Sequence, residues 1–217
     1  MTAVTSWPAM RARLRDLALS KSGLALVEFA YALPIFLVLL LGGLEVSNLA
    51  LTHLRINQIA MTVADNAGRV RTAIDETHIY EVFAGADLVG APIDFVDNGR
   101  IVLSSLEPNG RTGSQEGQMI NWQRCHGNFA VAPSYGTQGT GRTTSTLATG
   151  MGPAGNRIVS AEGTAVMFVE VTYQYRPAIF GGFGTAPTTI RYESAFNVRE
   201  RTNQNITNTQ GLALNSC

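Results

Sequence analysis

An uninterrupted apolar run near the beginning of the chain is the most regular pattern in the sequence. Residues 24–44 are 21 in number, and Glu28 is the only charged residue among them. At about 1.5 Å per residue, a helix of this length measures roughly 31 Å, which is enough to cross the hydrocarbon core of a bilayer. The pattern therefore predicts a transmembrane helix over 24–44, and Pro34 is expected to kink it.

The helical pattern continues beyond the apolar run. Apolar residues recur every seven positions at Leu49, Ile56, Val63 and Val70, and polar residues occupy the opposite face. Such a stripe is typical of an amphipathic helix that packs on a partner helix or on a sheet of its own domain. We expect a helical extension over 45–83, either as one continuous rod or as a separate helix packed on its own domain.

From residue 84 onward, the pattern changes to short strands separated by turns. Alternating or short apolar runs predict strands at 93–96, 100–106, 119–125, 165–175 and 188–199. The sequence Asp97-Asn98-Gly99 suits a tight turn, so the first two strands are expected to form a β-hairpin. Residues 133–156 are rich in glycine, serine and threonine, which indicates a long loop. A helix followed by antiparallel strands predicts an α+β fold, with a β-rich domain at 84–217.

Charge is distributed unevenly along the chain, although the formal net charge is zero. Residues 1–23 carry four basic residues against one acidic residue, whereas the rest of the chain has twelve arginines against fifteen acidic residues. Positively charged flanks of a membrane helix stay in the cytoplasm, so we expect a cytoplasmic leader at 1–23 and an exported domain beyond the span. The exported part has no basic patch, which argues against a nucleic-acid partner.

The two cysteines of the chain, Cys125 and Cys217, both fall in the predicted exported domain. An oxidising compartment permits a disulfide, and an even pair without another partner favours one. Such a bond closes a loop of about 90 residues, which the chain-entropy model values at roughly 4–5 kcal/mol. Two separate thiols are the alternative.

The junction between the leader and the apolar run needs an explanation. A charge costs on the order of 2.5–3.5 kcal/mol at the centre of a spanning helix and less near its end, so Glu28 is not readily retained by chance. An ordinary secretory signal has a shorter apolar core and a small-residue cleavage site, which does not follow Leu44. A plain signal anchor needs only the apolar run and the basic flank, and it leaves Gly23 and Glu28 unexplained.

Gly23, Glu28 and Phe29, with the leucine-rich stretch behind them, resemble the class III signal of type IV pilin-like proteins. More narrowly, residues 23–45 resemble the TadE/TadG-like pseudopilins of tight-adherence (Flp/Tad) pilus systems. In that family, a prepilin peptidase cuts after the glycine on the cytoplasmic side of the membrane, and the carboxylate five residues on is needed for assembly. The resemblance implies cleavage between Gly23 and Leu24, which places Glu28 at the fifth position of the mature chain.

The resemblance also implies a function in pilus assembly and adhesion. Phe29 stands where major Flp pilins usually have tyrosine, and the chain far exceeds their length, which favours a minor pseudopilin over the fibre subunit. The implied partners are the membrane, the prepilin peptidase, other pilins or pseudopilins and the inner-membrane assembly platform. The implied location is the bacterial inner membrane, with one span, a cytoplasmic N-terminus and a periplasmic C-terminal domain, and with incorporation into a surface pilus as a further step. The alternative is a membrane-tethered periplasmic binding module without a pilus role.

No sequence pattern predicts catalysis, a cofactor or a metal site, and we expect a protein that is not an enzyme. The sequence has no P-loop and no nucleophile elbow, and its three histidines lack the spacing of metal ligands. A hydrolase would need a polar constellation such as His126, Asp94 and Ser104, which their spacing does not support. Asp75 and Glu76 are adjacent, so on a helix their side chains point about 100° apart. We expect a solvated surface there.

Overall fold

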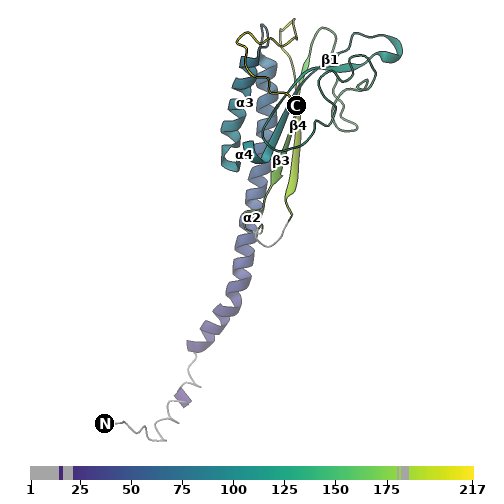
Figure 1. Ribbon diagram of the computed structural model, residues 1–217. Coiled ribbons are helices and arrows are strands. Elements are labelled where there is room, and N and C mark those ends of the chain that lie inside the picture. The colour runs from purple at the N-terminus through teal and green to yellow at the C-terminus, as the bar shows by residue number, and fades with distance from the viewer. Residues whose placement is uncertain (1–14, 17–21, 180, 182–185) are drawn as a thin grey trace. The chain divides into compact units, whose positions relative to one another are not determined.

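The structure is a computed structural model that describes residues 15–16, 22–179, 181 and 186–217 (Figure 1). Most of the predicted leader at 1–23 lies outside these residues. The chain divides into two compact units, Met1–Ser47 and Asn48–Cys217, and we call the second unit the head. The elements are α2 (Ser22–Arg69), α3 (Glu76–Gly90), η1 (Ala91–Ile93), α4 (Phe95–Asn98), β1 (Gly99–Pro108), η2 (Gly113–Gln115), β2 (Gln118–His126), β3 (Val166–Tyr175) and β4 (Thr188–Asn197). A long apolar helix followed by an antiparallel sheet confirms the α+β fold.

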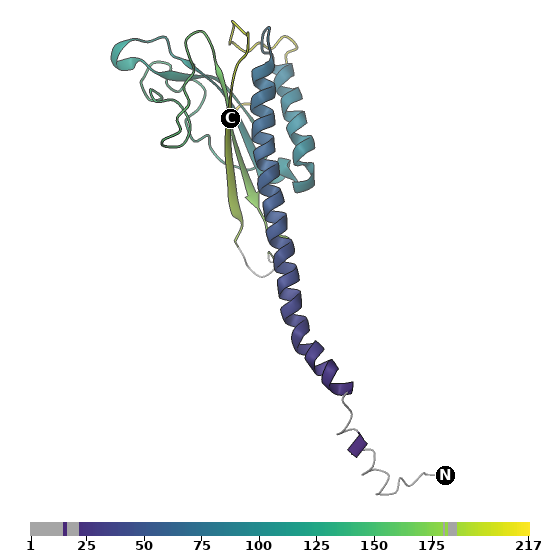
Figure 2. The same ribbon diagram turned by 180° about the vertical axis from the view of Figure 1, so that it is seen from behind.

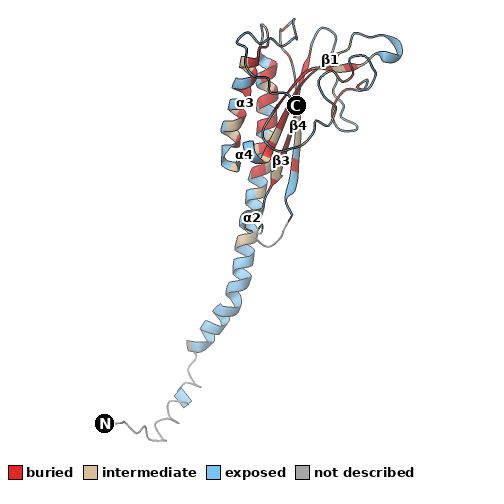
Figure 3. Cartoon of the chain, viewed as in Figure 1, coloured by how far each residue is buried: buried red, intermediate tan, exposed pale blue. Residues whose placement is uncertain are grey.

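In the first unit, α2 presents apolar side chains that no described residue of that unit covers. All side chains from residue 23 to residue 40 are exposed (Figure 3). Among the residues that the structure describes, α2 is the one helix long and apolar enough to cross a membrane, and none of its apolar window is buried. The core helix of a soluble protein would bury this surface, so the exposure supports membrane anchoring.

In the head, the remainder of α2 packs against one face of the sheet. Ile56 and Val63, two members of the seven-residue repeat, are fully buried, and Leu49 and Val70 pack at the border of the same core. Helix α3 lies beside this part of α2 in both views (Figures 1 and 2). The apolar side of α3 contributes to the same core, which also contains side chains from β1 and β3. The amphipathic pattern therefore corresponds to packing on the chain's own sheet.

Helix α2 ends at Arg69, before the expected end of the helical extension at residue 83, and α3 begins at Glu76. The end of β4 packs closely on this terminus: Arg199 N donates to Gly68 O at 3.2 Å, and a Cβ atom on Gly68 would lie 3.3 Å from Asn197 O. Asp75 then caps α3, because its side chain accepts a hydrogen bond from Thr77 N at 3.1 Å. The extension is thus two helices rather than one rod.

The four strands form one antiparallel sheet in the order β2-β1-β3-β4. The strands expected at 119–125, 165–175 and 188–199 are confirmed by β2, β3 and β4. The hairpin expected around Asp97-Asn98-Gly99 is wrong, because residues 91–98 form η1 and α4 and β1 starts at Gly99. The physical reason is Phe95, which is buried from a helical position and stacks on Tyr173 with ring centroids 6.2 Å apart.

Candidate processing and assembly site

The predicted scissile bond lies at the very start of α2. Gly23 is the second residue of the helix, and a Cβ atom built on it would meet nothing within 4 Å. Leu24 is 60% exposed, so no described part of the chain covers the Gly23–Leu24 bond. The first turn of a helix also has main-chain N–H groups without intrahelical partners, and it unwinds more easily than the interior. The bond is therefore open to an approaching enzyme.

Glu28 lies one helical turn after Leu24, on the same face of α2. An i,i+4 spacing corresponds to a rise of about 6 Å along the axis. The Glu28 side chain is exposed, and among the described residues none forms a hydrogen bond or an ion pair with it. Its neighbours on the helix surface include Tyr31, three residues further on, which is 75% exposed. Phe29, the next residue, is 61% exposed and points about 100° away. The arrangement is a single carboxylate on an apolar surface, available to a cation from outside this chain.

The two cysteines lie together in the head, although they are 92 residues apart in the sequence. Their Sγ atoms are 2.11 Å apart and their Cα atoms are 5.0 Å apart, which is disulfide distance. The chain around Cys217 is also held by hydrogen bonds: Cys125 N donates to Asn215 O at 2.7 Å, and Tyr80 Oη donates to Ala213 O at 2.8 Å. The last residues are therefore fastened to β2 and α3.

The surface expected to be solvated at Asp75 and Glu76 is in fact buried. Asp75 is 8% exposed and Glu76 is 1% exposed. The Asp75 carboxylate accepts hydrogen bonds from Thr209 N at 2.9 Å and from Thr207 Oγ1 at 2.8 Å, in addition to the cap of α3. These donors, with Thr209 N the strongest, hold the pKa of Asp75 well below its ordinary value. The expectation fails because residues 207–209 return to cover the start of α3.

Glu76 forms a buried ion pair with Arg124 of β2. Arg124 Nε donates to both Glu76 carboxylate oxygens, at 2.8 and 3.1 Å, and Nη2 also donates to Oε1. Arg124 Nη1 donates to Gln123 O at 2.7 Å and to Gln138 Oε1 at 3.1 Å, so the guanidinium has several acceptors. The pair was not predicted. The signal that could have revealed it is an arginine inside the strand expected at 119–125, where a buried charge requires a partner.

Among the described residues, His126, Asp94 and Ser104 have separate partners. His126 Nε2 pairs with Asp87 Oδ1 at 2.7 Å, and Ser104 Oγ accepts from Gln123 Nε2 at 3.0 Å. Within the described residues, no hydrogen bond joins His126, Asp94 and Ser104. The same part of the chain holds no group of three or more His, Cys, Asp or Glu side chains that could bind a metal ion.

Part of the chain, including the junction between the leader and the apolar run, matches a known protein family. The family model described as TadE-like protein matches residues 23–65, which is about a fifth of the chain. The match begins at Gly23 and includes Leu24, Glu28 and Phe29. No protein of curated function and no solved structure matches the chain significantly. The chain thus carries a TadE-like segment, consistent with a structural component of a Tad pilus system that resembles TadE and TadG.

Proposed function

We propose that this chain is a membrane-anchored minor pseudopilin that acts in the assembly of a Tad/Flp-type pilus and in adhesion. The observation that carries the proposal is the position of the family match, which begins at Gly23 and contains the only charge of the apolar run. The exposed apolar surface of α2 supports membrane anchoring. In the proposed arrangement, the protein spans the bacterial inner membrane once, with the leader in the cytoplasm and the head in the periplasm.

The first proposed step is hydrolysis of the Gly23–Leu24 amide bond by a prepilin peptidase. Water adds across the bond, which leaves a carboxylate on Gly23 of the leader and an α-ammonium group on Leu24 of the mature chain. The absence of a side chain at Gly23 lets the peptidase approach the main chain closely, and the basic leader keeps the bond on the cytoplasmic side.

The second proposed step uses Glu28 as an assembly contact. Two opposite unit charges about 4 Å apart attract each other by roughly 4 kcal/mol at an effective dielectric constant of 20. This is comparable to the cost of about 2.5–3.5 kcal/mol for one charge at the centre of a spanning helix, and the ammonium group carries a desolvation cost of its own. A new α-ammonium group on a neighbouring subunit would therefore offset much of the cost of holding Glu28 among packed apolar helices. In this proposal, the other partners are the pilins and the inner-membrane assembly platform that receive the cleaved subunit.

Cleavage is tested by measuring the mass of the chain in cells with and without the prepilin peptidase. We expect residues 1–23 to be lost only when the peptidase is present. The variant Gly23→Leu should accumulate uncut, because its side chain obstructs the scissile bond. The matched control is Gly42→Leu, since Gly42 also lies in α2 with nothing within 4 Å of a Cβ position. An uncut chain in both strains at normal expression contradicts the proposal and favours a membrane-tethered binding module.

The assembly contact is tested separately with Glu28→Val. This variant should insert into the membrane as well as the parent chain, or better, and it should still be cut after Gly23. Pilus formation, counted by electron microscopy, should be strongly reduced because the cation on the neighbouring subunit loses its partner. Ala25→Val provides an apolar control in the same turn of the helix. Normal pili with Glu28→Val would show that the carboxylate has no role in assembly.

A further inference from the structure

The chain covers one edge of its sheet along most of its length. Strand β2 is an edge strand, and loop 139–147 and the segment near Asn215 bond to its outer side. The main-chain hydrogen bonds are Gln118 N to Leu147 O, Ile120 N to Thr140 O, Gly139 N to Ile120 O and Cys125 N to Asn215 O. An uncovered edge offers free N–H and C=O groups with which another chain can pair as a strand. At β2, these segments occupy most of those groups, so another strand cannot pair there.

The opposite edge, β4, is open over most of its length. Val198 N donates to Ala165 O at 2.9 Å, and this pair continues the β3–β4 register. In an antiparallel ladder, bonded and non-bonded positions alternate, so the even-numbered residues of β4 bond to β3. The main-chain groups of Arg191, Glu193 and Ala195 therefore point away from the sheet. No described residue forms a main-chain hydrogen bond with them.

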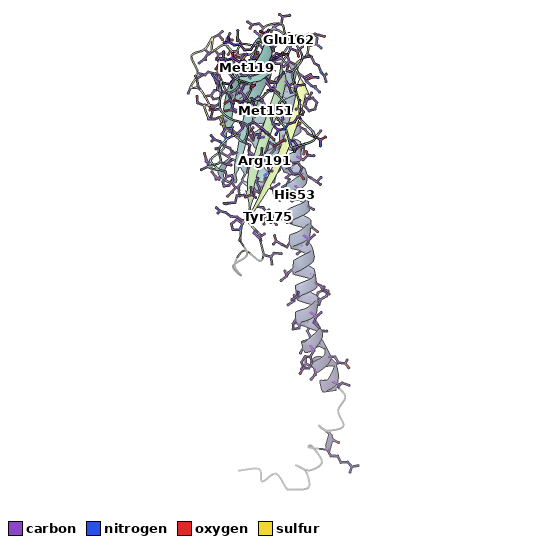
Figure 4. All side chains as sticks on the ribbon, turned by 90° about the vertical axis from the view of Figure 1, so that its right-hand side faces the viewer. His53, Met119, Met151, Glu162, Tyr175 and Arg191 are labelled. Atoms are coloured by element: carbon purple, nitrogen blue, oxygen red, sulfur yellow. A yellow bond between two sulfur atoms is a disulfide. The ribbon has the colours of Figure 1, made fainter. Side chains whose placement is uncertain are left out.

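Two hollows flank this open edge, one on each face of the sheet. The first has a volume of about 610 Å³, and its lining includes Tyr135, Ile158, Phe168 and the β4 residues Arg191 to Ala195. Figure 4 looks onto this face, opposite the helices, with Arg191 and Met151 labelled. The second has a volume of about 320 Å³ and lies between α2 and the end of β4, where Phe196 and Arg199 line it. A strand added beside β4 would direct alternate side chains to the two faces.

The first hollow suits apolar side chains. Its charged groups already have partners: Arg191 Nη2 lies 2.8 Å from Glu170 Oε2 and 2.5 Å from Glu193 Oε1, and Tyr135 Oη donates to Glu193 Oε1 at 2.9 Å. The apolar surface that remains for a ligand comes largely from Pro153, Ile158 and Ala195, which are exposed or half-buried and line the hollow. Apolar groups entering this space gain from leaving water and displace no existing ion pair.

The second hollow suits an acidic side chain. Arg69 at its border is paired with Asp65 at 2.6 Å. Arg199 is exposed, and its side chain forms no ion pair with any residue that the structure describes. The hollow thus carries one uncompensated positive charge beside the open main chain of β4.

A second copy of β4 does not match this chemistry. In β4, Arg191 and Glu193 lie on the face of the first hollow, so an added copy would place charges at alternate positions along an apolar surface. Even as an ion pair, Arg191 and Glu193 of a copy would have to leave water at an apolar surface, and this desolvation can exceed their attraction. An occupant that alternates apolar residues on one face with polar residues on the other avoids this cost.

We propose that the free edge of β4 binds an extended segment of another protein as a fifth strand. This segment has apolar side chains at alternate positions, facing Pro153 and Ile158, and an acidic side chain facing Arg199. Main-chain bonds to Arg191, Glu193 and Ala195 provide the pairing, and the two hollows provide the selectivity. This interaction does not depend on cleavage after Gly23.

The test uses the full chain in detergent micelles and a short synthetic peptide in which valine or leucine alternates with threonine. Two versions carry a glutamate at one end or the other, since the direction of pairing sets which end meets Arg199. Amide hydrogen exchange is measured at single residues. With peptide at ten times its Kd, exchange at Arg191, Glu193 and Ala195 should slow about tenfold, by mass action. The amides of Tyr192 and Ser194, which already bond to β3, should change little.

Two variants separate main-chain pairing from contact with the hollow. Ala195→Pro removes one outward N–H group and keeps the ladder to β3, so peptide affinity should fall roughly tenfold. Ile158→Asn places a polar group in the first hollow and should also weaken binding. Val159→Asn is its matched control, because Val159 is 54% exposed and does not line the hollow. A peptide of the same composition with its apolar residues adjacent should bind much more weakly than the alternating one.

Three results would overturn the proposal. The first is unchanged exchange at Arg191, Glu193 and Ala195 with either peptide. The second is protection of these amides that increases with protein concentration in the absence of peptide, which would assign the edge to a second copy. The third is protection confined to the loop around Ile158, which would assign the hollow to a ligand that does not pair as a strand.

Discussion

The buried pair of Glu76 and Arg124 allows a quantitative prediction about the stability of the head. Their side chains are 1% and 6% exposed, so removing one partner leaves the other charge away from water. Breaking such a pair typically costs 3–5 kcal/mol, roughly. Glu76→Gln should therefore lower the free energy of unfolding by about 3–5 kcal/mol. For a unit of this size, each kcal/mol corresponds to about 2–4 °C, so Tm should fall by roughly 6–20 °C.

The measurement is urea and thermal unfolding of the full chain in detergent, followed by the fluorescence of Trp122. This residue is 2% exposed, and its Nε1 donates to Gln204 O at 3.0 Å, so its emission reports on packing near the pair. The control is Asp65→Asn, which removes an ion pair to Arg69, a side chain that is 63% exposed. An i,i+4 pair of this kind contributes only about 0.3–0.5 kcal/mol.

A second comparison distinguishes the pair from the separate contacts of its two residues. Replacing both charges at once, with Glu76→Leu and Arg124→Met, leaves no unpaired buried charge. The double variant should therefore be more stable than either single variant. A buried pair of this strength is excluded if Glu76→Gln is no more destabilising than Asp65→Asn, or if the effects of Glu76→Leu and Arg124→Met on the free energy of unfolding simply add.

Three further predictions concern other parts of the head. Cys217→Ser should lower the free energy of unfolding by up to about 4–5 kcal/mol, because the bond closes a loop of 92 residues; melting that is insensitive to this change and to reductant would contradict it. Gly90→Ala should destabilise the head by about 1–3 kcal/mol, because its Cβ would overlap Phe95. Gly85→Ala, in the same helix, meets nothing within 4 Å and should stabilise the head by up to about 1 kcal/mol. Thermal melts of the two variants measure both effects. Burial raises the pKa of Glu170, so at a pH between its unfolded and folded pKa values the folded state retains a proton that the unfolded state has lost. The free energy of unfolding should therefore decline as pH rises above about 4.3, the ordinary pKa of glutamate. Urea unfolding of Glu170→Gln should show less of this decline.

The sequence predicts the regular elements because their patterns are local. The apolar run at 24–44, the seven-residue repeat that includes Ile56 and Val63, and the strands that became β2, β3 and β4 are all visible as periodicity. The mistaken hairpin arose because Asp97-Asn98-Gly99 has the composition of a tight turn. Long-range stacking of Phe95 on Tyr173 decided the conformation instead.

The buried polar contacts of the head depend on residues distant in the sequence. Glu76 meets Arg124 across 48 positions, and the Asp75 carboxylate meets Thr209 N across 134 positions. Asp75 and Glu76 have the local pattern of a solvated surface, and the strand position of Arg124 indicates only that it needs a partner, so no periodicity could pair them. The cysteine pair was accessible because only two candidates exist. The TadE-like segment that begins at Gly23 could be recognised because its residues are contiguous in the sequence, and cleavage there stays a prediction.

The segment that completes the covered edge at β2 has a consequence for the order of biosynthesis. Residues 204–217 follow every helix and strand of the head, yet they contribute Asn215 and Cys217 to the outer side of β2. Because synthesis runs from the N-terminus, β1, β2 and β3 emerge before these residues, and this end of β2 stays uncovered until they arrive. The bond between Cys125 and Cys217 can form only after that interval. Formation of this bond therefore marks the moment when the outer side of β2 is fully covered.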